Sequence, residues 1–84
     1  MQEPVISYTH HASEMLNERG IEREWIEQTI VKPEVVKPDA RRENVFLAFR
    51  RIPERGNRFL RVVYARAGNM SRVITVFFDR RQRS

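Results

Sequence analysis

Two kinds of side chain in this sequence can do chemistry: the two histidines and the many arginines. His10 and His11 are adjacent near the start of the chain, and all twelve basic side chains of residues 41–84 are arginines. Histidine suits proton transfer because its ordinary pKa lies at about 6.5, and arginine suits phosphate because its planar donors match two phosphate oxygens. Together they can supply what RNA cleavage by the ribose 2′-hydroxyl needs, namely a base, an acid and cations around the phosphorus.

The charge of the chain is divided unequally between its two halves. Residues 1–40 carry a net charge of −4 and residues 41–84 a net charge of +9, which gives the total of +5. The arginines of the second half are set into apolar runs with strand character, such as RFLRVVYARA. We expect their guanidinium groups to gather on a single accessible surface that binds a polyanion, most economically nucleic acid.

Length and composition exclude several classes of protein. The 84 residues suffice for one domain, 1–84, in which residues 79–84 are expected to form a mobile basic tail. The chain has no cysteine, and neighbouring histidines diverge by about 100° on a helix, so no metal site is expected. No apolar run approaches the roughly 20 residues that cross a bilayer, and the first residues do not resemble a signal peptide. We therefore expect a cytoplasmic protein that uses no cofactor and contacts no membrane.

Helix signals occur only in the acidic half. Residues 4–8 form an extended entry, Thr9 is suited to cap a helix, and Gly20 is suited to end it. A second helix is expected over about 22–31, because Lys32 precedes Pro33 and is thereby disfavoured from helical conformation. The sequence thus predicts two short helices before the basic half begins.

Strand signals dominate the basic half. Strands are expected over 44–52, 59–65 and 72–78, joined by short loops that make neighbouring strands antiparallel. Residues 32–39, with prolines at 33 and 38, form a turn or a short exposed strand. The predicted fold is α+β, with two N-terminal helices packed on a three- to four-stranded antiparallel sheet.

Both faces of the predicted sheet are rich in apolar residues. In the middle strand one face holds Leu60, Val62 and Tyr64, and the other holds Phe59, Arg61, Val63 and Ala65. In the last strand Ile74, Val76 and Phe78 oppose Val73, Thr75 and Phe77. Two short helices cover only one face, so the other forms a groove, a homodimer contact or a site for a partner chain; alternatively, strand twist and loops cover it.

Arg61 is the most informative cation because it lies in the middle of a strand among apolar neighbours. An unpaired charge there is costly, so Arg61 either pairs with a carboxylate or faces an anionic ligand. The candidate carboxylates are Glu14, Glu18 and Asp79. Arg50 and Arg51 point to opposite faces of their strand, so only one of them shares the Arg61 surface, and simple alternation does not decide which.

Four further residues are candidates for contact with nucleic acid: Arg58, Arg66, Tyr64 and Arg72. The three arginines lie near strand ends, where a solvated side chain is the simpler interpretation. Tyr64 either donates to a phosphate or stacks on a base, or else belongs to the core with its hydroxyl at the rim. Arg80, Arg81 and Arg83 in the tail favour non-specific attraction to a polyanion.

The order of several short motifs resembles one small bacterial family. The motifs are Tyr8-Thr9-His10-His11-Ala12, Glu18-Arg19-Gly20-Ile21, Leu60-Arg61-Val62-Val63-Tyr64 and Val73-Ile74-Thr75-Val76. That family is a domain of unknown function and is similar to the BrnT and RelE-like ribonuclease toxins. The similarity covers about residues 6–78 and implies helices against a curved antiparallel sheet.

The resemblance implies metal-independent RNA cleavage, free or on the ribosome, by the toxin of a toxin–antitoxin pair. His11 takes the place of the base, and Arg61 with Arg50 would stabilise the charge on the phosphate. The alternative for His11 is a structural histidine that packs at a helix start. Met15 stands where the family pattern usually has an arginine, which weakens the case for an active nuclease.

Two other functions are compatible with the same residues. The first is a non-catalytic module that holds nucleic acid or an acidic protein on its cationic sheet. The second is a homo-oligomeric structural domain whose open sheet face is self-complementary.

Overall fold

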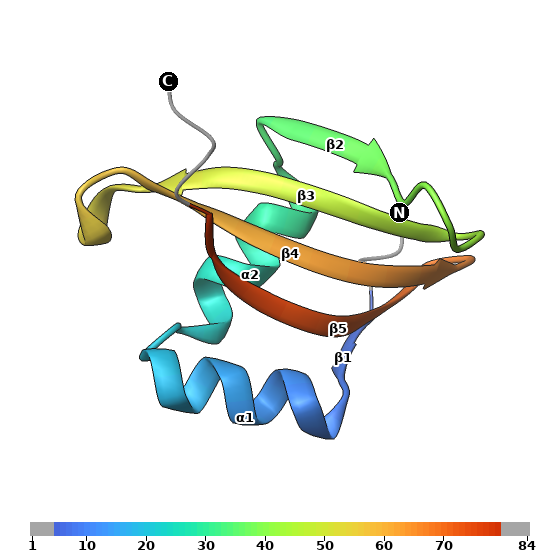
Figure 1. Ribbon diagram of the computed structural model, residues 1–84, viewed down its shortest axis with the longest axis horizontal. Coiled ribbons are helices and arrows are strands. Elements are labelled where there is room, and N and C mark those ends of the chain that lie inside the picture. The colour runs from blue at the N-terminus through green and yellow to red at the C-terminus, as the bar shows by residue number, and fades with distance from the viewer. Residues whose placement is uncertain (1–4, 80–84) are drawn as a thin grey trace.

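The computed structural model describes residues 5–79, which form one sheet and two helices (Figure 1). In chain order the elements are β1 (Val5–Tyr8), α1 (His10–Arg19), α2 (Arg23–Val31), β2 (Val35–Pro38), β3 (Val45–Ile52), the 3₁₀ turn η1 (Pro53–Arg55), β4 (Arg58–Ala67) and β5 (Met70–Asp79). The predicted α+β class is confirmed. Residues 1–4 and 80–84 lie outside the described part, and with them the tail arginines Arg80, Arg81 and Arg83.

The sheet has five strands in the order β1-β5-β4-β3-β2. β3, β4 and β5 form the predicted antiparallel meander, and β2 adds antiparallel to β3. β1 pairs in parallel with β5, so the sheet is mixed. The sheet has more strands than predicted because two short extended segments join it as edge strands. These are β1, near the N-terminus, and β2, which follows Pro33 and ends at Pro38.

The first helix has both of its predicted caps. The Thr9 side-chain oxygen accepts a hydrogen bond from the Ala12 N–H at 3.1 Å, which satisfies one of the free donors of the first turn. Gly20 ends the helix in the left-handed conformation with φ 63°, which is costly for a residue with a Cβ. Ile21 N–H then bonds back to the Leu16 carbonyl at 2.9 Å and turns the chain toward α2.

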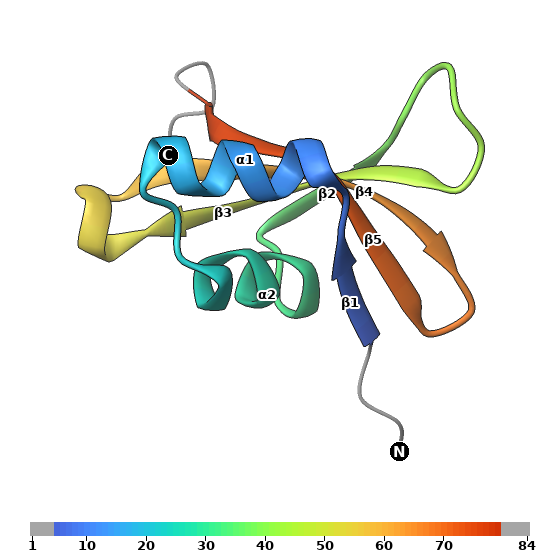
Figure 2. The ribbon, with the colours of Figure 1, turned by 90° about the horizontal axis from the view of Figure 1, so that it is seen from below.

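The main core lies between the helices and one face of the sheet, here called the helix-covered face. Both helices lie on this side (Figures 1 and 2). The buried cluster is formed by Ala12, Leu16, Ile21, Trp25 and Ile26 from the helical half and by Ala48, Ile52, Leu60, Val62, Tyr64, Val73 and Val76 from the sheet. Trp25 also holds Thr29, whose hydroxyl donates to the Trp25 carbonyl at 2.7 Å within α2.

The opposite face, here called the helix-free face, carries no helix of residues 5–79. Cross-strand register places on it residues 45, 47, 49 and 51 of β3, 59, 61, 63 and 65 of β4, and 75, 77 and 79 of β5. Four of its apolar side chains are nevertheless buried: Val45, Phe49, Phe59 and Val63. Sheet twist and the crowding of neighbouring side chains therefore cover part of this face.

One prediction about the last strand is wrong. Val73 was expected on the same face as Thr75, but it is fully buried in the main core and lies opposite Tyr64. The cause is an irregularity in the register between Val63 and Tyr64, where β5 holds one extra residue, Ile74. A β-bulge of this kind shifts the alternation of every residue on one side of it.

The C-terminal boundary also differs from the prediction. Asp79 was assigned to the mobile tail, but it is the last residue of β5, opposite Phe59, and it is buried. Asp79 contacts Arg61 at 3.4 Å across the sheet, and composition alone does not show this pairing.

Candidate functional site

The two arginines expected to act together, Arg50 and Arg61, lie on opposite faces of the sheet. Arg50 pairs with Leu60 on the helix-covered face, whereas Arg61 pairs with Phe49 on the helix-free face. The expectation that the arginines of the basic half gather on a single surface is therefore wrong. The physical reason is the two-residue period of a strand, which separates arginines at even and odd positions.

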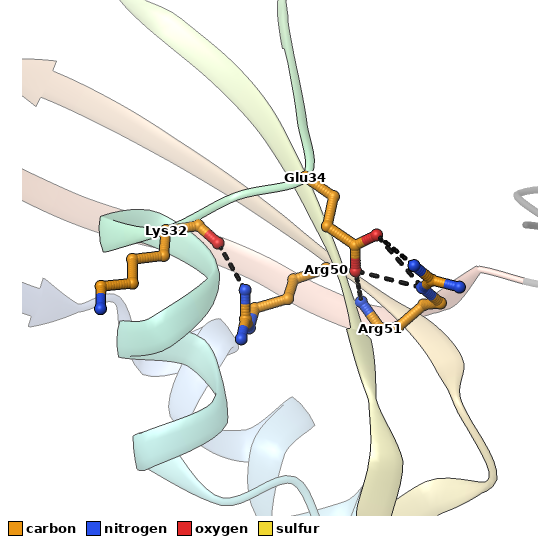
Figure 3. Close-up of polar contacts among 4 residues, drawn as sticks. All are labelled: Lys32, Glu34, Arg50 and Arg51. Carbon is orange, nitrogen blue, oxygen red and sulfur yellow. Dashed lines mark hydrogen bonds and ion pairs between the residues drawn. The ribbon is translucent and has the colours of Figure 1, made fainter.

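Arg50 is engaged by the end of a helix. Its Nη1 donates a hydrogen bond to the Lys32 carbonyl oxygen at 2.8 Å (Figure 3), directly after the last residue of α2. Arg55 makes the equivalent contact with α1, because its Nη1 donates to the Gly20 carbonyl at 3.3 Å. A cation satisfies the free carbonyls and the negative end of the helix dipole, so both arginines stabilise helix C-termini.

Arg61 is held between two aromatic rings on the helix-free face. Its guanidinium carbon lies 5.7 Å from the centre of the Phe49 ring and 5.1 Å from that of Phe77. Its Nη1 contacts Asp79 Oδ2 at 3.4 Å, so of the three candidate carboxylates Asp79 is the one that pairs. The side chain is 28% exposed, and its buried Nε has no hydrogen-bond partner among residues 5–79. Cation–π attraction on both sides helps to offset that unsatisfied donor.

Two more cations lie over aromatic rings on the same face. Lys37 Nζ lies 5.8 Å from the centre of the Phe49 ring, and the Arg51 guanidinium carbon lies 5.9 Å from that of Phe59. Register aligns Phe49, Arg61 and Phe77 across β3, β4 and β5. We call these three residues together with Lys37 the aromatic–cation row. Arg51, and not Arg50, is therefore the neighbour of Arg61.

Arg51 is fixed by Glu34, just before β2. Glu34 accepts from the Arg51 backbone N–H at 2.8 Å and from its Nε at 3.1 Å (Figure 3). The backbone N–H of Arg51, followed by its side chain, lowers the pKa of Glu34 below the ordinary 4.5. Within residues 5–79, Arg51 and Arg61 thus have acid partners, whereas no ion pair forms at Lys37 or Arg72.

His11 lies at the edge of β5 and not among the arginines. Its Nε2 is 3.4 Å from the Thr75 hydroxyl, at the only hydrogen-bonding distance that its ring makes within residues 5–79. His10 points elsewhere and contacts Glu14 one turn later at 2.7 Å. The structure therefore brings His11 beside the helix-free face but does not assemble His11, Arg61 and Arg50 into one site.

The four other candidates divide between the two faces. Tyr64 belongs to the main core, where burial raises the pKa of its hydroxyl, and the Arg58 guanidinium lies 4.9 Å from the centre of the Phe78 ring, which packs on that core. Arg66 and Arg72 lie near the β4–β5 turn at the other end of the strands. Of the four candidates, Arg72 lies on the helix-free face, opposite Ala65, whereas Arg66 alternates onto the face of Tyr64.

Tyr8 connects the first strand to the second helix. Its hydroxyl is 3.5 Å from Glu27 Oε2, and the Arg23 guanidinium lies 5.2 Å from its ring centre. Burial, followed by the neighbouring Glu27 charge, raises the pKa of Tyr8 to about 12. The phenol therefore stays protonated at neutral pH and serves as a structural link.

Residues 5–79 contain no group of three or more histidine, cysteine or acidic side chains arranged to hold a metal ion. In the same part of the chain no helix has the length and apolar character that crossing a membrane requires.

Residues 8–78 match the model of a protein family described as a domain of unknown function, DUF4258. The chain belongs to this family. No curated protein and no solved structure matches the chain. The match begins at the last residue of β1 and ends next to the last residue of β5, so the DUF4258 domain includes both helices and the whole aromatic–cation row.

Sequence reasoning missed several residues of the aromatic–cation row. Phe49, Phe77 and Lys37 were not singled out, because the contacts of Arg61 with the two rings and of Lys37 with Phe49 depend on register across four strands. The sequence did hold a signal for Phe49 and Phe77. Each lies next in sequence to a residue of the main core, Ala48 or Val76, so the two-residue period of a strand places it on the opposite face. No sequence signal identified Arg55 as a partner of Gly20, 35 residues earlier in the chain.

Proposed function

We propose that this domain is a non-catalytic module that binds single-stranded RNA on its helix-free face. The observation that carries the proposal is the aromatic–cation row, in which Arg61 lies between Phe49 and Phe77 and Lys37 lies over Phe49. Single-stranded RNA offers bases that stack on a partly exposed ring such as Phe77 and phosphates that attract cations such as Lys37, so both components of the row have a partner in it.

The charge of the face supports the same ligand class. Arg51 and Arg61 are neutralised by Glu34 and Asp79, while Lys37 and Arg72 have no acid partner within residues 5–79. Phe77 is only partly buried, so part of its ring is open to a base. A face that carries unpaired cations and a partly exposed ring favours a polyanion whose bases also stack. We propose cytoplasmic RNA as its source.

The test is RNA binding by two adjacent phenylalanine variants. Phe77→Leu removes an aromatic ring from the helix-free face, and we expect it to weaken binding of a ten-nucleotide RNA about tenfold. Phe78→Leu is the matched control, because Phe78 packs against the main core and lies under Arg55 and Arg58. Fluorescence anisotropy at several salt concentrations measures both, with affinity falling as salt rises.

Two results would contradict the proposal. The first is the absence of salt-dependent binding by the unaltered protein at micromolar concentration. The second is an equal loss of RNA affinity in Phe77→Leu and Phe78→Leu. Equal losses would mean that both substitutions weaken binding by destabilising the fold. A second pair of variants tests the charge of the face in the same way. Lys37→Ala should weaken RNA binding more than its control, Lys32→Ala, which removes a lysine at the end of α2.

The alternative is the ribonuclease toxin implied by the resemblance, with His11 as base. Its support is the 3.4 Å distance between His11 Nε2 and Thr75 Oγ1 at the border of the helix-free face. Against it stands Arg50, which is bonded to Lys32 on the other side of the sheet. RNA fragments that disappear with His11→Ala and persist with His10→Ala would replace the binding proposal by this one, and growth arrest relieved by a partner protein would identify an antitoxin.

A further inference from the structure

A second feature of the helix-free face lies at its far end, beside the β4–β5 turn. It is an open depression of about 460 Å³, and it is lined by Ser7, Tyr8, Ala65, Arg66, Ala67, Met70 and Arg72. The β4–β5 hairpin that forms it projects beside β1, away from both helices (Figure 2). A hollow of this size falls within the range of roughly 300–1,000 Å³ that small-molecule sites occupy.

The register explains why the surface is hollow here. Ser7, Arg72 and Ala65 lie side by side on β1, β5 and β4, and Ala67 lies opposite Met70 in the next row. These five residues alternate onto the helix-free face, and three of them have very small side chains. β3 pairs no further along β4 than Ala65, so no neighbouring strand fills the space beyond it.

The charge of the depression is uniformly positive. Arg66 and Arg72 are its only ionisable side chains apart from the Tyr8 phenol, and neither arginine forms an ion pair within residues 5–79. Register places Arg72 on the same face as Ala65 and Ala67, whereas Arg66 alternates to the other face and its Nε donates to the Gly68 carbonyl at 3.5 Å. The lining thus combines an apolar floor of alanines with one arginine, Arg72, that is suited to phosphate.

The hairpin that carries both arginines is held in a tight turn. Gly68 and Asn69 alone connect β4 to β5, and Gly68 has a φ of 59°, which suits a glycine at the first central position of such a turn. The Val5 N–H also donates to the Asn69 carbonyl at 2.9 Å, which ties the turn to β1. Arg66 and Arg72 therefore project from a backbone that is fixed on both sides.

We propose that this depression binds one nucleotide unit, with the base against Ala65 and Ala67 and the phosphate at Arg72. The inference rests on the proposed function, because it makes the depression one subsite of the RNA path over the helix-free face. The nucleotide is either a member of an RNA strand or a free mononucleotide, which share this chemistry.

The experiment follows amide resonances of isotopically labelled protein during titration with adenosine 5′-monophosphate, inorganic phosphate and the ten-nucleotide RNA. We expect the monophosphate to shift the amides of Ala65, Ala67 and Met70. Arg72→Gln should weaken its binding about tenfold, and Ala67→Leu should do the same by filling the floor. Arg19→Gln is the control, because it removes the same charge from an exposed position on α1.

The inference is overturned if the monophosphate leaves these amides unchanged, or if phosphate alone binds as tightly and is insensitive to Ala67→Leu. RNA binding that depends on Phe77 but not on Arg72 or Ala67 would overturn the subsite and leave the proposed function intact. Monophosphate binding in the depression without RNA binding would support the subsite, identify a free nucleotide as its ligand, and contradict the proposed function.

Discussion

The two faces of the sheet use arginine for different purposes. On the helix-covered side, Arg50 and Arg55 donate to the carbonyl groups that end α2 and α1. On the helix-free side, Arg51 and Arg61 lie over phenylalanine rings and pair with acids. A net charge of +9 in the second half of the chain is therefore not a measure of its ligand-binding capacity, since much of that charge is used within the fold.

The apolar residues of the two faces differ as well. Those of the helix-covered face belong to one cluster that includes both helices. Those of the helix-free face are covered mainly by their own neighbours, as Phe49 is by Lys37 and Arg61. Removing a side chain should consequently leave a cavity on the first face and a surface notch on the second, which can relax or admit water.

The largest expected effect comes from two leucines on opposite faces. Leu60→Ala should lower the free energy of unfolding by about 3 kcal/mol, because Leu60 is fully buried in the main core. Leu47→Ala should lower it by only about 1 kcal/mol, because Leu47 is half-buried on the helix-free face. Urea denaturation followed by circular dichroism measures both. Equal losses would show that the two faces are packed alike.

A smaller effect should separate the adjacent arginines Arg50 and Arg51. Arg50→Ala removes the donor to the Lys32 carbonyl and should cost about 1 kcal/mol of stability, with the loss concentrated in α2. Arg51→Ala removes a solvent-exposed ion pair with Glu34 and should cost about 0.5 kcal/mol. Amide hydrogen exchange of residues 28–32 distinguishes the two, since only Arg50→Ala should accelerate it.

The smallest effect concerns the dependence of stability on pH. The pKa of Glu34 is lowered on folding, so its carboxylate stabilises the fold above its ordinary value of 4.5, and this contribution is lost as the pH falls through the lower folded value. Glu34→Gln should therefore flatten the decrease in stability between about pH 5 and pH 3.

Thermal unfolding of Glu34→Gln and of Glu24→Gln provides the comparison. Glu24→Gln is the control for the loss of one negative charge, because Glu24 is exposed on α2 and its side chain makes no hydrogen bond or ion pair within residues 5–79. An unchanged profile in Glu34→Gln would mean that its contact with Arg51 adds nothing in solution. Asp39, whose pKa is lowered by the Arg41 backbone N–H and the Arg42 side chain, should account for part of the remaining slope.

The sequence predicts those parts of the fold that depend on local chemistry. Thr9 and Gly20 bound α1 as expected, and β3, β4 and β5 begin and end within two residues of their predicted limits. The alternation along β4 also places Leu60, Val62 and Tyr64 in the core and Arg61 outside it, as predicted. Each of these features follows from caps, turns and periodicity over a few residues.

The remaining features depend on contacts between distant parts of the chain. The parallel pairing of β1 with β5 and the extra residue at Ile74 have no local signature, so Val73 was assigned to the wrong face. The candidate site depends still more on register, because Phe49, Arg61 and Phe77 come from three strands. Its proposed use for RNA is a prediction that the binding experiments above must decide.

The pairing of β1 with β5 has a consequence for biosynthesis. Thr9, at the start of α1, bonds through its N–H to the Val73 carbonyl and through its hydroxyl to the Ile74 carbonyl, so the first helix is anchored on the last strand. A nascent chain cannot make these contacts until residues 70–79 have left the ribosome exit tunnel. Folding of this domain should therefore wait until β5 has been synthesised and has emerged, and a stop codon within β5 should leave an aggregation-prone chain.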